Sequence, residues 1–434
     1  MGALFKIAFR NLTRQWKYSL AAFLSIVTGF LSLCLFRAYM VDIAHMYVES
    51  YQHRSMYGHF LIEKDTPSED PWDRLLGIAD QQFIERWMSH HASEIKERVR
   101  FLRATGIVSN GTSGTLFIAK GYDVESGARL RGESWAWDTA AGEPLHITKR
   151  PTPIVIGKTL GSILECETKA SRLYSKFGGY SAEIRPFTCP ETRLQLNVTT
   201  PSGQANAIEG NVVGLIDGIF KEIDSKLINM NLGDMQRLFD TKALTHYTVE
   251  LKDDTQVDRL MEDLRREARA IGLALRVIRW QDHKEGDIYV RTMELLSIFR
   301  NFVVSIMLAI SGLSVFNTFL KIVNERTREI GTLRSLGYQK SDVSFLFLTE
   351  AGLLAVFGVI VGAALSTLST WAINSAAILY KAGMLSEPVP FRIAYDFGVY
   401  STSAVFLVVI AVVAAVGAVA STVRRPIHEN LIHA

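Results

Sequence analysis

Four long apolar stretches stand out in the pattern of hydrophobic and polar residues along the chain. They cover residues 18–36, 301–320, 351–380 and 397–423, whereas residues 37–300 are mostly polar. A helix needs about 20 apolar residues to cross roughly 30 Å of hydrocarbon, and a water-soluble helix of this length would carry a charged face. We therefore predict an α-helical membrane protein with four transmembrane helices and one large soluble domain inserted between the first two.

The long polar part of the chain mixes the periodicities of strands and helices. The charged stretch 254–271 has apolar residues at helical spacing and lies between two β-rich runs, 245–251 and 273–278. This alternation predicts an α+β domain with a twisted sheet. Residues 166–206 contain several prolines and glycines, and we expect an irregular insert there. The other runs that predict strands are 60–62, 106–108, 115–118 and 153–156. The predicted inner face of the helix consists of Val257, Leu260, Met261, Leu264 and Ala268.

Basic residues gather beside the apolar stretches and predict the orientation of the chain. Under the positive-inside rule, short loops rich in Lys and Arg face the cytoplasm. We therefore place both termini and the loop 321–342 in the cytoplasm, with 42–292 and 381–396 on the outer side. The net charge of +3 gives no indication of nucleic acid binding. The basic residues are Lys6, Arg10, Arg14 and Lys17, then Lys321, Arg326, Arg328, Arg334 and Lys340, and finally Arg424 and Arg425.

Together these patterns divide the chain into membrane-spanning, cytoplasmic and outer segments. The first apolar stretch has a signal peptide as its alternative, although residues 37–40 are a poor small-residue cleavage site. The charged residues 282–300 continue into the second apolar stretch without a helix breaker, so we expect this helix to extend beyond the bilayer as a stalk. The predicted segments are a cytoplasmic amphipathic helix (1–17), transmembrane helices (18–41, 293–320, 343–380 and 397–423), the outer domain with its stalk ends (42–292), a cytoplasmic loop (321–342), an outer turn (381–396) and a cytoplasmic tail (424–434).

Cysteines and glycines suggest covalent and packing roles. Cys166 and Cys189 both lie in the outer domain, where an oxidising compartment would let them pair, but sequence alone leaves the pairing open. Cys34 lies in the first apolar stretch. Gly358 and Gly362 form a small-xxx-small pattern that allows two helices to approach closely. No Cys/His spacing typical of a metal site occurs in the sequence.

The most specific local pattern is the charged loop 324–337, with the sequence NERTREIGTLRSLG. Its mixture of Glu, Arg and apolar residues, ended by a glycine, predicts a short helix. A solvated connector is the plain alternative, but Ile330, Leu333 and Leu336 would then need cover, which we expect from something in the cytoplasm. Glu350, near the start of the third span, is either a functional intramembrane carboxylate or a structural partner at the interface.

Several segments resemble the FtsX-like/MacB-like permeases, which are subunits of type VII, or mechanotransmission, ABC transporters. The resemblance covers nearly the whole chain, with the same layout of one span, an outer domain and three spans, and it is weakest near 166–206. Its motifs are ERTREIGTLRSLG with the following FLTEAGLLAVFGVIVGAALS, the N-terminal KIAFRNLTRQWKYSLAAFLSI, the basic tail 423–431, the outer segments 153–160, 211–215, 223–228 and 232–238, and Trp280.

The resemblance implies that 324–337 is a coupling helix that docks in a groove of a cytoplasmic ABC ATPase. It also implies an ATPase dimer and a second permease subunit in the lipid bilayer, either a copy of this chain or a related one. The sequence has no GxxxxGK[ST] phosphate loop, so we expect ATP and Mg²⁺ in the partner, and no cofactor or catalytic residue in this chain. The residues implied to contact the ATPase are Glu325, Arg326, Thr327, Arg328, Glu329, Ile330, Leu333 and Arg334.

The resulting expectation is a permease subunit in the bacterial inner membrane, with its large domain in the periplasm. It would couple ATP hydrolysis by the separate ATPase to movement of the periplasmic domain, driving lipoprotein release or export of an envelope substrate. A lipoprotein cargo or a periplasmic carrier would then be a further partner. The alternative is an FtsX-type signal transmitter that activates a periplasmic partner without transport. A membrane-anchored enzyme has the least support, since no nucleophile–His or paired-carboxylate pattern stands out.

Overall fold

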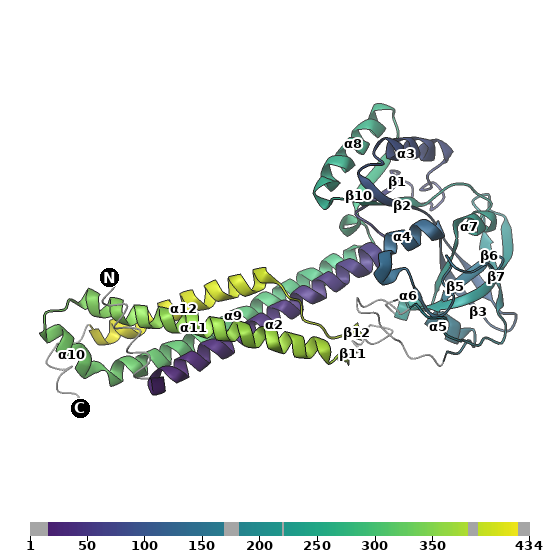
Figure 1. Cartoon of the computed structure of the whole chain (residues 1–434). Coiled ribbons are helices and arrows are strands. Elements are labelled where there is room, and N and C mark those ends of the chain that lie inside the picture. Colours follow the sequence, from purple (N-terminus) through teal and green to yellow (C-terminus); the bar gives the residue numbers. More distant parts are fainter. Residues whose placement is uncertain (1–15, 169–181, 219–220, 381–388, 424–434) are drawn as a thin grey trace. The chain divides into compact units, whose positions relative to one another are not determined.

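The computed structural model describes residues 16–168, 182–218, 221–380 and 389–423, which form two compact units (Figure 1). The membrane unit contains residues up to 45, residues 292–378 and those from 391 onward; the α+β unit contains residues 46–291 and 379–390. The divisions after 45 and after 291 fall inside continuous helices. Most of the predicted amphipathic helix (1–15), the tail 424–434 and part of the outer turn (381–388) lie outside the described residues.

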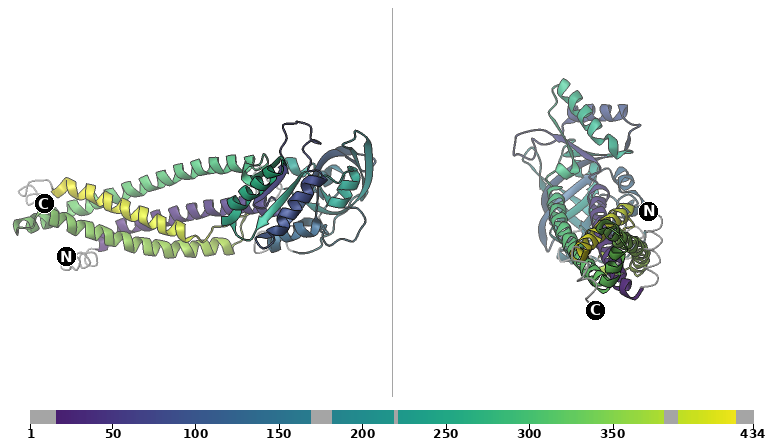
Figure 2. Two further views of the ribbon diagram at one scale, coloured as in Figure 1. Left: turned by 90° about the horizontal axis from the view of Figure 1, so that it is seen from above. Right: turned by 90° about the vertical axis from the view of Figure 1, so that its left-hand side faces the viewer.

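Long helices make up the membrane unit (Figures 1 and 2). Within the described residues, four helices are long and apolar enough to cross a membrane. The first two contain 34 and 39 residues, which at about 1.5 Å per residue corresponds to about 51 and 58 Å, well beyond the roughly 30 Å of hydrocarbon. The helices are α2 (Trp16–Glu49), α9 (Asp287–Glu325), α11 (Lys340–Ser375) and α12 (Phe397–Val423), with the short α10 (Thr327–Ser335) and the π-helical turn η1 (Ser50–Arg54) after α2.

The third long helix ends earlier than predicted. We expected a span up to residue 380, whereas α11 ends at Ser375. The Asn374 side-chain amide donates to the carbonyl of Ile393 and accepts from its N–H, both at 3.0 Å. The chain then extends into β11 (Leu379–Tyr380), which pairs antiparallel with β12 (Val389–Pro390). The prediction is wrong at this end because a polar side chain binds the returning backbone where the apolar pattern continues.

Glycines bring α2 and α11 into close contact. A Cβ atom on Gly362 would lie 3.0 Å from Cβ of Phe30, and one on Gly358 would lie 2.7 Å from Cγ2 of Ile26. Ile26 and Phe30 are buried. The small-residue face of α11 therefore leaves just enough room for these two side chains, as in other membrane helix pairs.

One ten-stranded sheet is the framework of the α+β unit (Figure 1). Its strands run in the order β10-β1-β9-β2-β3-β8-β5-β7-β4, and β6 pairs with both β2 and β7. The pairs β3–β8 and β5–β7 are parallel and the other pairs are antiparallel. The strands are β1 (Phe60–Lys64), β2 (Ile95–Ser109), β3 (Gly114–Tyr122), β4 (Thr139–Gly142), β5 (Pro153–Gly157), β6 (Arg193–Thr199), β7 (Ala205–Ile216), β8 (Leu227–Asn231), β9 (His246–Leu251) and β10 (Leu275–Arg279).

Strand β2 joins the two halves of this sheet. Its N-terminal part pairs with β9, and its C-terminal part pairs with β3 from Phe101↔Tyr122 to Ser109↔Gly114. With 15 residues it is long enough to serve both neighbours in turn. Side chains along β2 and β3 alternate between the two faces of the sheet, so this strand pair contributes to a core on each face.

Helices cover both faces of the sheet and form an apolar core with each face. The larger core includes Phe117 and Ala119 of β3 together with residues of α3, α5, α7 and α8. The smaller core includes Phe101 and Tyr122 together with Leu130 of α4. The helices are α3 (Ile78–His90), α4 (Val124–Trp135), α5 (Lys158–Ile163), α6 (Lys221–Asp224), α7 (Leu232–Leu238) and α8 (Val257–Ala270), with 3₁₀ turns η2 (Asp254–Gln256) and η3 (Trp280–Asp282).

The predicted fold class is confirmed: four membrane-spanning helices accompany an α+β domain inserted between the first and the second. The predicted inner face of the helix at 254–271 is also buried as expected. The expectation of an irregular insert is wrong for the second half of 166–206, because β6 pairs there with the start of β7. The alternation of buried Leu194, Leu196 and Val198 identifies β6 as a strand, and the nearby prolines obscured it.

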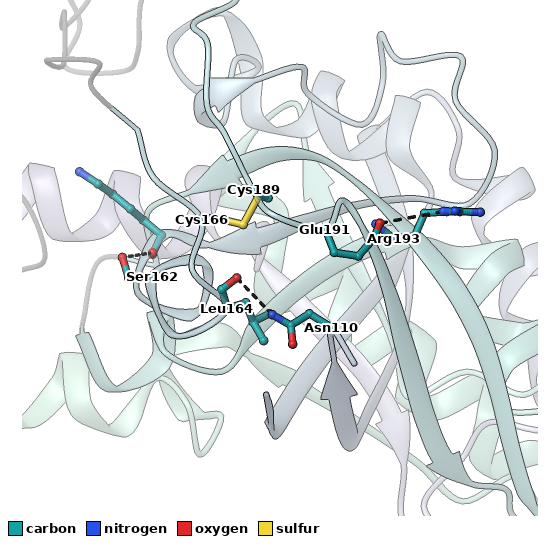
Figure 3. Close-up of a disulfide and its surroundings, with 8 residues drawn as sticks. Asn110, Ser162, Leu164, Cys166, Cys189, Glu191 and Arg193 are labelled. Atoms are coloured by element: carbon teal, nitrogen blue, oxygen red, sulfur yellow. Dashed lines mark hydrogen bonds and ion pairs between the residues drawn. A yellow bond between two sulfur atoms is a disulfide. The ribbon is translucent and has the colours of Figure 1, made fainter. Parts of the chain in front are cut away.

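A disulfide between Cys166 and Cys189 closes the first part of this segment (Figure 3). Beside it, Glu167 and Thr188 exchange two backbone hydrogen bonds, at 2.7 and 2.9 Å. The side-chain amide of Asn110 donates to the carbonyl of Leu164 at 3.4 Å. These contacts hold the ends of the loop against the sheet.

Gly362→Leu should destabilise the membrane unit by about 1–3 kcal/mol, because the added side chain overlaps Phe30 and overpacking has costs of this size. The thermal unfolding midpoint of the purified full chain in detergent measures the effect. Gly352→Leu in the same helix is the matched control, since a Cβ there would meet nothing within 4 Å. Equal midpoints for the two variants would contradict the packing role of Gly362.

Replacing Cys166 and Cys189 by Ala should lower the free energy of unfolding of the α+β unit by about 3 kcal/mol. The cysteines are 23 positions apart, and freeing such a loop in the unfolded chain has a cost of about this size. Urea unfolding of the full chain, followed by tryptophan fluorescence, should shift on reduction in the parent protein and not in the double variant. A parent protein insensitive to reductant would refute this.

Candidate functional site

Helix α10 lies between two membrane helices, and tight turns define its ends. Arg326 is the single residue between the last residue of α9 and the first of α10. At the other end Gly337 has φ +97°, the left-handed conformation that glycine adopts without strain. The N–H groups of Tyr338 and Gly337 donate to the carbonyls of Leu333 and Arg334, both at 3.2 Å. This is a Schellman ending, so the predicted glycine stop has a defined geometry.

A buried ion pair fixes the start of α10 to α11. The Arg326 guanidinium donates from Nη1 to Oε2 of Glu350 at 2.6 Å and from Nε to Oε2 of Glu329 at 2.8 Å. Its central carbon also lies 4.8 Å from the centre of the Phe347 ring, within the range of a cation–π interaction. Glu350 is only 4% exposed. Each charge therefore depends on the other, because an unpaired charge would be costly to bury.

Apolar side chains complete the attachment of α10. Ile330 is buried in a cluster with Val323, Val343, Phe347 and Val419, which come from α9, α11 and α12, and Leu333 packs against this cluster. Of the three apolar residues that we expected to need cover from the cytoplasm, Ile330 is covered by its own chain, Leu333 is covered in part, and Leu336 remains exposed. The helical spacing of these residues is the pattern of a helix packed against its own chain.

The opposite side of α10 carries charged and apolar side chains into the solvent. We define its outward face as Arg328, Glu329 and Thr332 of α10 together with the flanking residues Glu325 and Leu336, all of which are exposed. Leu336 is 72% exposed and is the most exposed large apolar side chain of the loop 324–337. The outward face thus combines both charge signs with one apolar contact point.

The structure divides the residues that were predicted to contact an ATPase into three groups. Glu325, Arg328 and Glu329 are exposed, Leu333 and Arg334 are half-buried, and the remaining three are buried. The buried ones are Arg326, Thr327 and Ile330, whose side chains bond or pack within this chain.

Sequence reasoning did not identify Glu350 as the partner of Arg326, and it grouped Leu336 with Ile330 and Leu333 without distinguishing the exposed residue from the other two. Glu350 lies 24 positions from Arg326, so no local pattern links the two. A signal for Leu336 was present, since it is one turn after Leu333 and directly before the glycine that ends the helix. Among the described residues, no group of three or more His, Cys, Asp or Glu is placed to bind a metal ion.

Comparison with known protein families gives a match that includes this loop. Residues 301–427 match the family model of the FtsX-like permease C-terminal domain. The chain is 26% identical over 190 residues to the macrolide export ATP-binding/permease protein MacB of Brucella abortus, which covers 40% of this chain and 28% of that protein. It is 25% identical over 186 residues to an uncharacterized ABC transporter permease of Methanocaldococcus jannaschii, which covers 40% of this chain and 43% of that protein.

The chain therefore spans less than half the length of these relatives. Among solved structures, the periplasmic region of MacB from Actinobacillus actinomycetemcomitans aligns with 55% of this chain and 92% of that one, with 11% identity and a TM-score of 0.34. The sequence matches are to membrane permeases, and the four long apolar helices of this chain are what a membrane protein requires. Residues 301–427 therefore resemble the C-terminal domain of FtsX-like permeases, and the chain is similar in sequence to the MacB-type permeases.

Proposed function

We propose that this chain is the permease subunit of an ABC transporter whose ATP hydrolysis takes place in a separate ATPase. The outward face of α10 would dock in that ATPase, in the cytoplasm, and the complex would contain two ATPases and two permease subunits. The proposal places the chain in a bacterial inner membrane with both termini in the cytoplasm and the α+β unit in the periplasm. The basic residues of the loop between α9 and α11 support this orientation.

The observation that carries the proposal is the contrast between the two sides of α10. One side is held by a buried ion pair and an apolar cluster, and the other presents Arg328 and Leu336 to the solvent. A connector that only turned the chain would need neither the rigid attachment nor an exposed leucine. A short helix fixed at its base and exposed on its outer side suits a docking element that transmits force.

The length of α9 supports a mechanical role. This helix runs without interruption from Asp287 to Glu325, and only Arg326 separates it from α10. A displacement of α10 by an ATPase would therefore move α9 directly, because the junction is too short and too well bonded to absorb it. We propose that this movement reaches the α+β unit, and that the substrate is an envelope molecule such as a lipoprotein.

Arg328→Glu should weaken the attachment of the ATPase at least tenfold, since a reversed charge at a polar interface is strongly unfavourable. The measurement is purification of the full chain from its native membrane in a mild detergent, with quantification of every copurifying protein. Arg266→Glu, an exposed helical position of the α+β unit, is the matched control. An ATPase retained equally by both variants would contradict docking through α10.

The same experiment on the parent protein separates the transport function from the signalling alternative. Lipoproteins or an envelope carrier among the copurifying proteins would support transport. A periplasmic cell-wall hydrolase without cargo would instead support an FtsX-type signal transmitter. The absence of an ATPase from the parent preparation would overturn the proposed function as a whole.

Glu350→Ala should destabilise the membrane unit by about 3–5 kcal/mol, because it leaves the Arg326 guanidinium buried without its carboxylate. Arg326→Met combined with Glu350→Leu removes both charges and should recover most of that loss. Thermal unfolding of the full chain in detergent compares the three proteins. If α10 must be oriented by this pair, the stable double variant should still bind the ATPase more weakly. Full ATPase binding by the double variant would limit the pair to a structural role.

A further inference from the structure

The β2–β3 strand pair has one face that is covered at one end and open at the other. On this face the direct cross-strand pairs are Phe101↔Tyr122, Arg103↔Lys120, Thr105↔Ile118 and Ile107↔Leu116. The first pair belongs to the smaller apolar core, under α4. The last two pairs lie beyond that cover, and the Arg103–Lys120 pair occupies the boundary between the buried and the open part.

Lys120 differs from the neighbouring cations because no carboxylate of the described residues forms an ion pair with it. Arg103 forms an ion pair with Glu285, and Arg131 forms one with Asp138 at 2.5 Å. Among the described residues, no carboxylate lies within ion-pair distance of the Lys120 ammonium.

The surroundings of Lys120 disfavour its positive charge. Its ammonium and the Arg103 guanidinium lie 6.0 and 5.6 Å from the centre of the Tyr57 ring, a contact that favours both cations but also brings their like charges near each other. Burial, reinforced by the positive charges of Arg103 and Arg131, lowers the pKa of Lys120 to about 7. A ligand with a negative charge would relieve this, because it would favour the charged form.

A second polar group beside Lys120 is also incompletely bonded. Asn229 of β8 is directly opposite Lys120 in the parallel pair β3–β8. It is buried, and its Oδ1 atom accepts no hydrogen bond from the described residues. Buried amide oxygens are normally satisfied. This unbonded atom is an acceptor, so it is open to a donor such as a ligand hydroxyl and not to an anionic oxygen, which leaves Lys120 as the group that would contact an anion.

The open end of the same face is apolar. Leu116 is 61% exposed, Ile107 is 52% exposed and Ile118 is 40% exposed. Leu116 and Ile107 are cross-strand partners, and Ile118 is the next residue on that face toward Lys120. From residue 116 to residue 120 a strand advances about 14 Å. An apolar strip of this length that ends at an unbalanced cation has the pattern of an amphiphile site.

We propose that the open part of the β2–β3 face binds an amphipathic anion. Its carboxylate or phosphate group contacts Lys120, and its hydrocarbon chain lies along Ile118, Leu116 and Ile107. The anion supplies the charge that Lys120 lacks, and the chain covers the exposed apolar side chains. The site consists of residues of the α+β unit alone, so it does not depend on ATPase docking through α10.

The test uses the full chain in phosphatidylcholine nanodiscs with hexyl phosphate as the probe. In an Ile118→Cys, Cys34→Ala protein, residue 118 is the reactive thiol, since the other two cysteines form the disulfide. Hexyl phosphate should slow maleimide labelling of this thiol at least fivefold, whereas hexanol and inorganic phosphate should not. Ile271→Cys in the Cys34→Ala protein is the matched control, because Ile271 is 60% exposed at the end of α8, outside the strip. Its labelling should not change.

Variants of the lysine test the anionic part. Lys120→Gln should raise the concentration of hexyl phosphate needed for half-maximal protection at least tenfold, and Lys120→Arg should restore it to within a few-fold. Nanodiscs with phosphatidylglycerol identify the source of the anion. If the thiol at residue 118 is protected in these nanodiscs without hexyl phosphate, the anion is a lipid headgroup. If it is protected only when hexyl phosphate is added, the anion is a soluble amphiphile.

Five results would overturn the proposal. Equal protection of residues 118 and 271 would remove the site. Equal protection of residue 118 by hexanol and by hexyl phosphate would show that the anionic group is not recognised. So would an unchanged half-maximal concentration of hexyl phosphate in the Lys120→Gln variant. Protection by inorganic phosphate alone would remove the role of the strip. Protection that follows protein concentration and not ligand would assign the strip to a second copy of the chain.

Discussion

A guanidinium at the junction of two helices can be buried only if a carboxylate is buried with it, because either charge alone would be too costly to desolvate. Arg326, between α9 and α10, and Glu350, in α11, satisfy this condition, with a distance of 2.6 Å between Nη1 and Oε2. Since Arg326 is the one residue between α9 and α10, the direction of its side chain determines how α10 is rotated. Ile330 then faces inward to its apolar cluster, and Arg328 remains in solvent.

Glu329 connects the inner and outer sides of α10. Its carboxylate accepts from Nε of Arg326, yet the residue is exposed. A partner that contacts Glu329 would therefore compete with Arg326 for the same carboxylate. Such competition would weaken one of the bonds that hold α10 in its present rotation, while the Glu350 bond would remain. The side chain of Glu329 thus connects the outward face of α10 directly to the buried Arg326–Glu350 pair. A force applied to the outward face would need to pass through only this one side chain to reach the pair.

The sequence predicted the class of the fold well, because each long apolar stretch has only one plausible structure in a membrane. It also located the strands whose β-rich runs stand apart from their neighbours, such as β1 and β5. It missed β6, where Leu194, Leu196 and Val198 alternate beside prolines, and it missed the early end of α11. That end depends on Asn374 binding the backbone of Ile393, a contact across the returning chain that no local pattern contains.

In the candidate site, too, the sequence predicted what depends on neighbouring residues and missed what depends on distant ones. The charged pattern of 324–337 identified a short helix and its glycine end, because both depend on neighbouring residues. It did not show which charges are buried, since the burial of Arg326 depends on a carboxylate in another helix.

Lys120 is the converse case, in which a half-buried cation has no carboxylate among the described residues. The same chain provides Glu350 as the partner of the buried Arg326. The lack of a described carboxylate beside Lys120 therefore points to an external ligand. The partner of Lys120 is therefore best sought outside the chain.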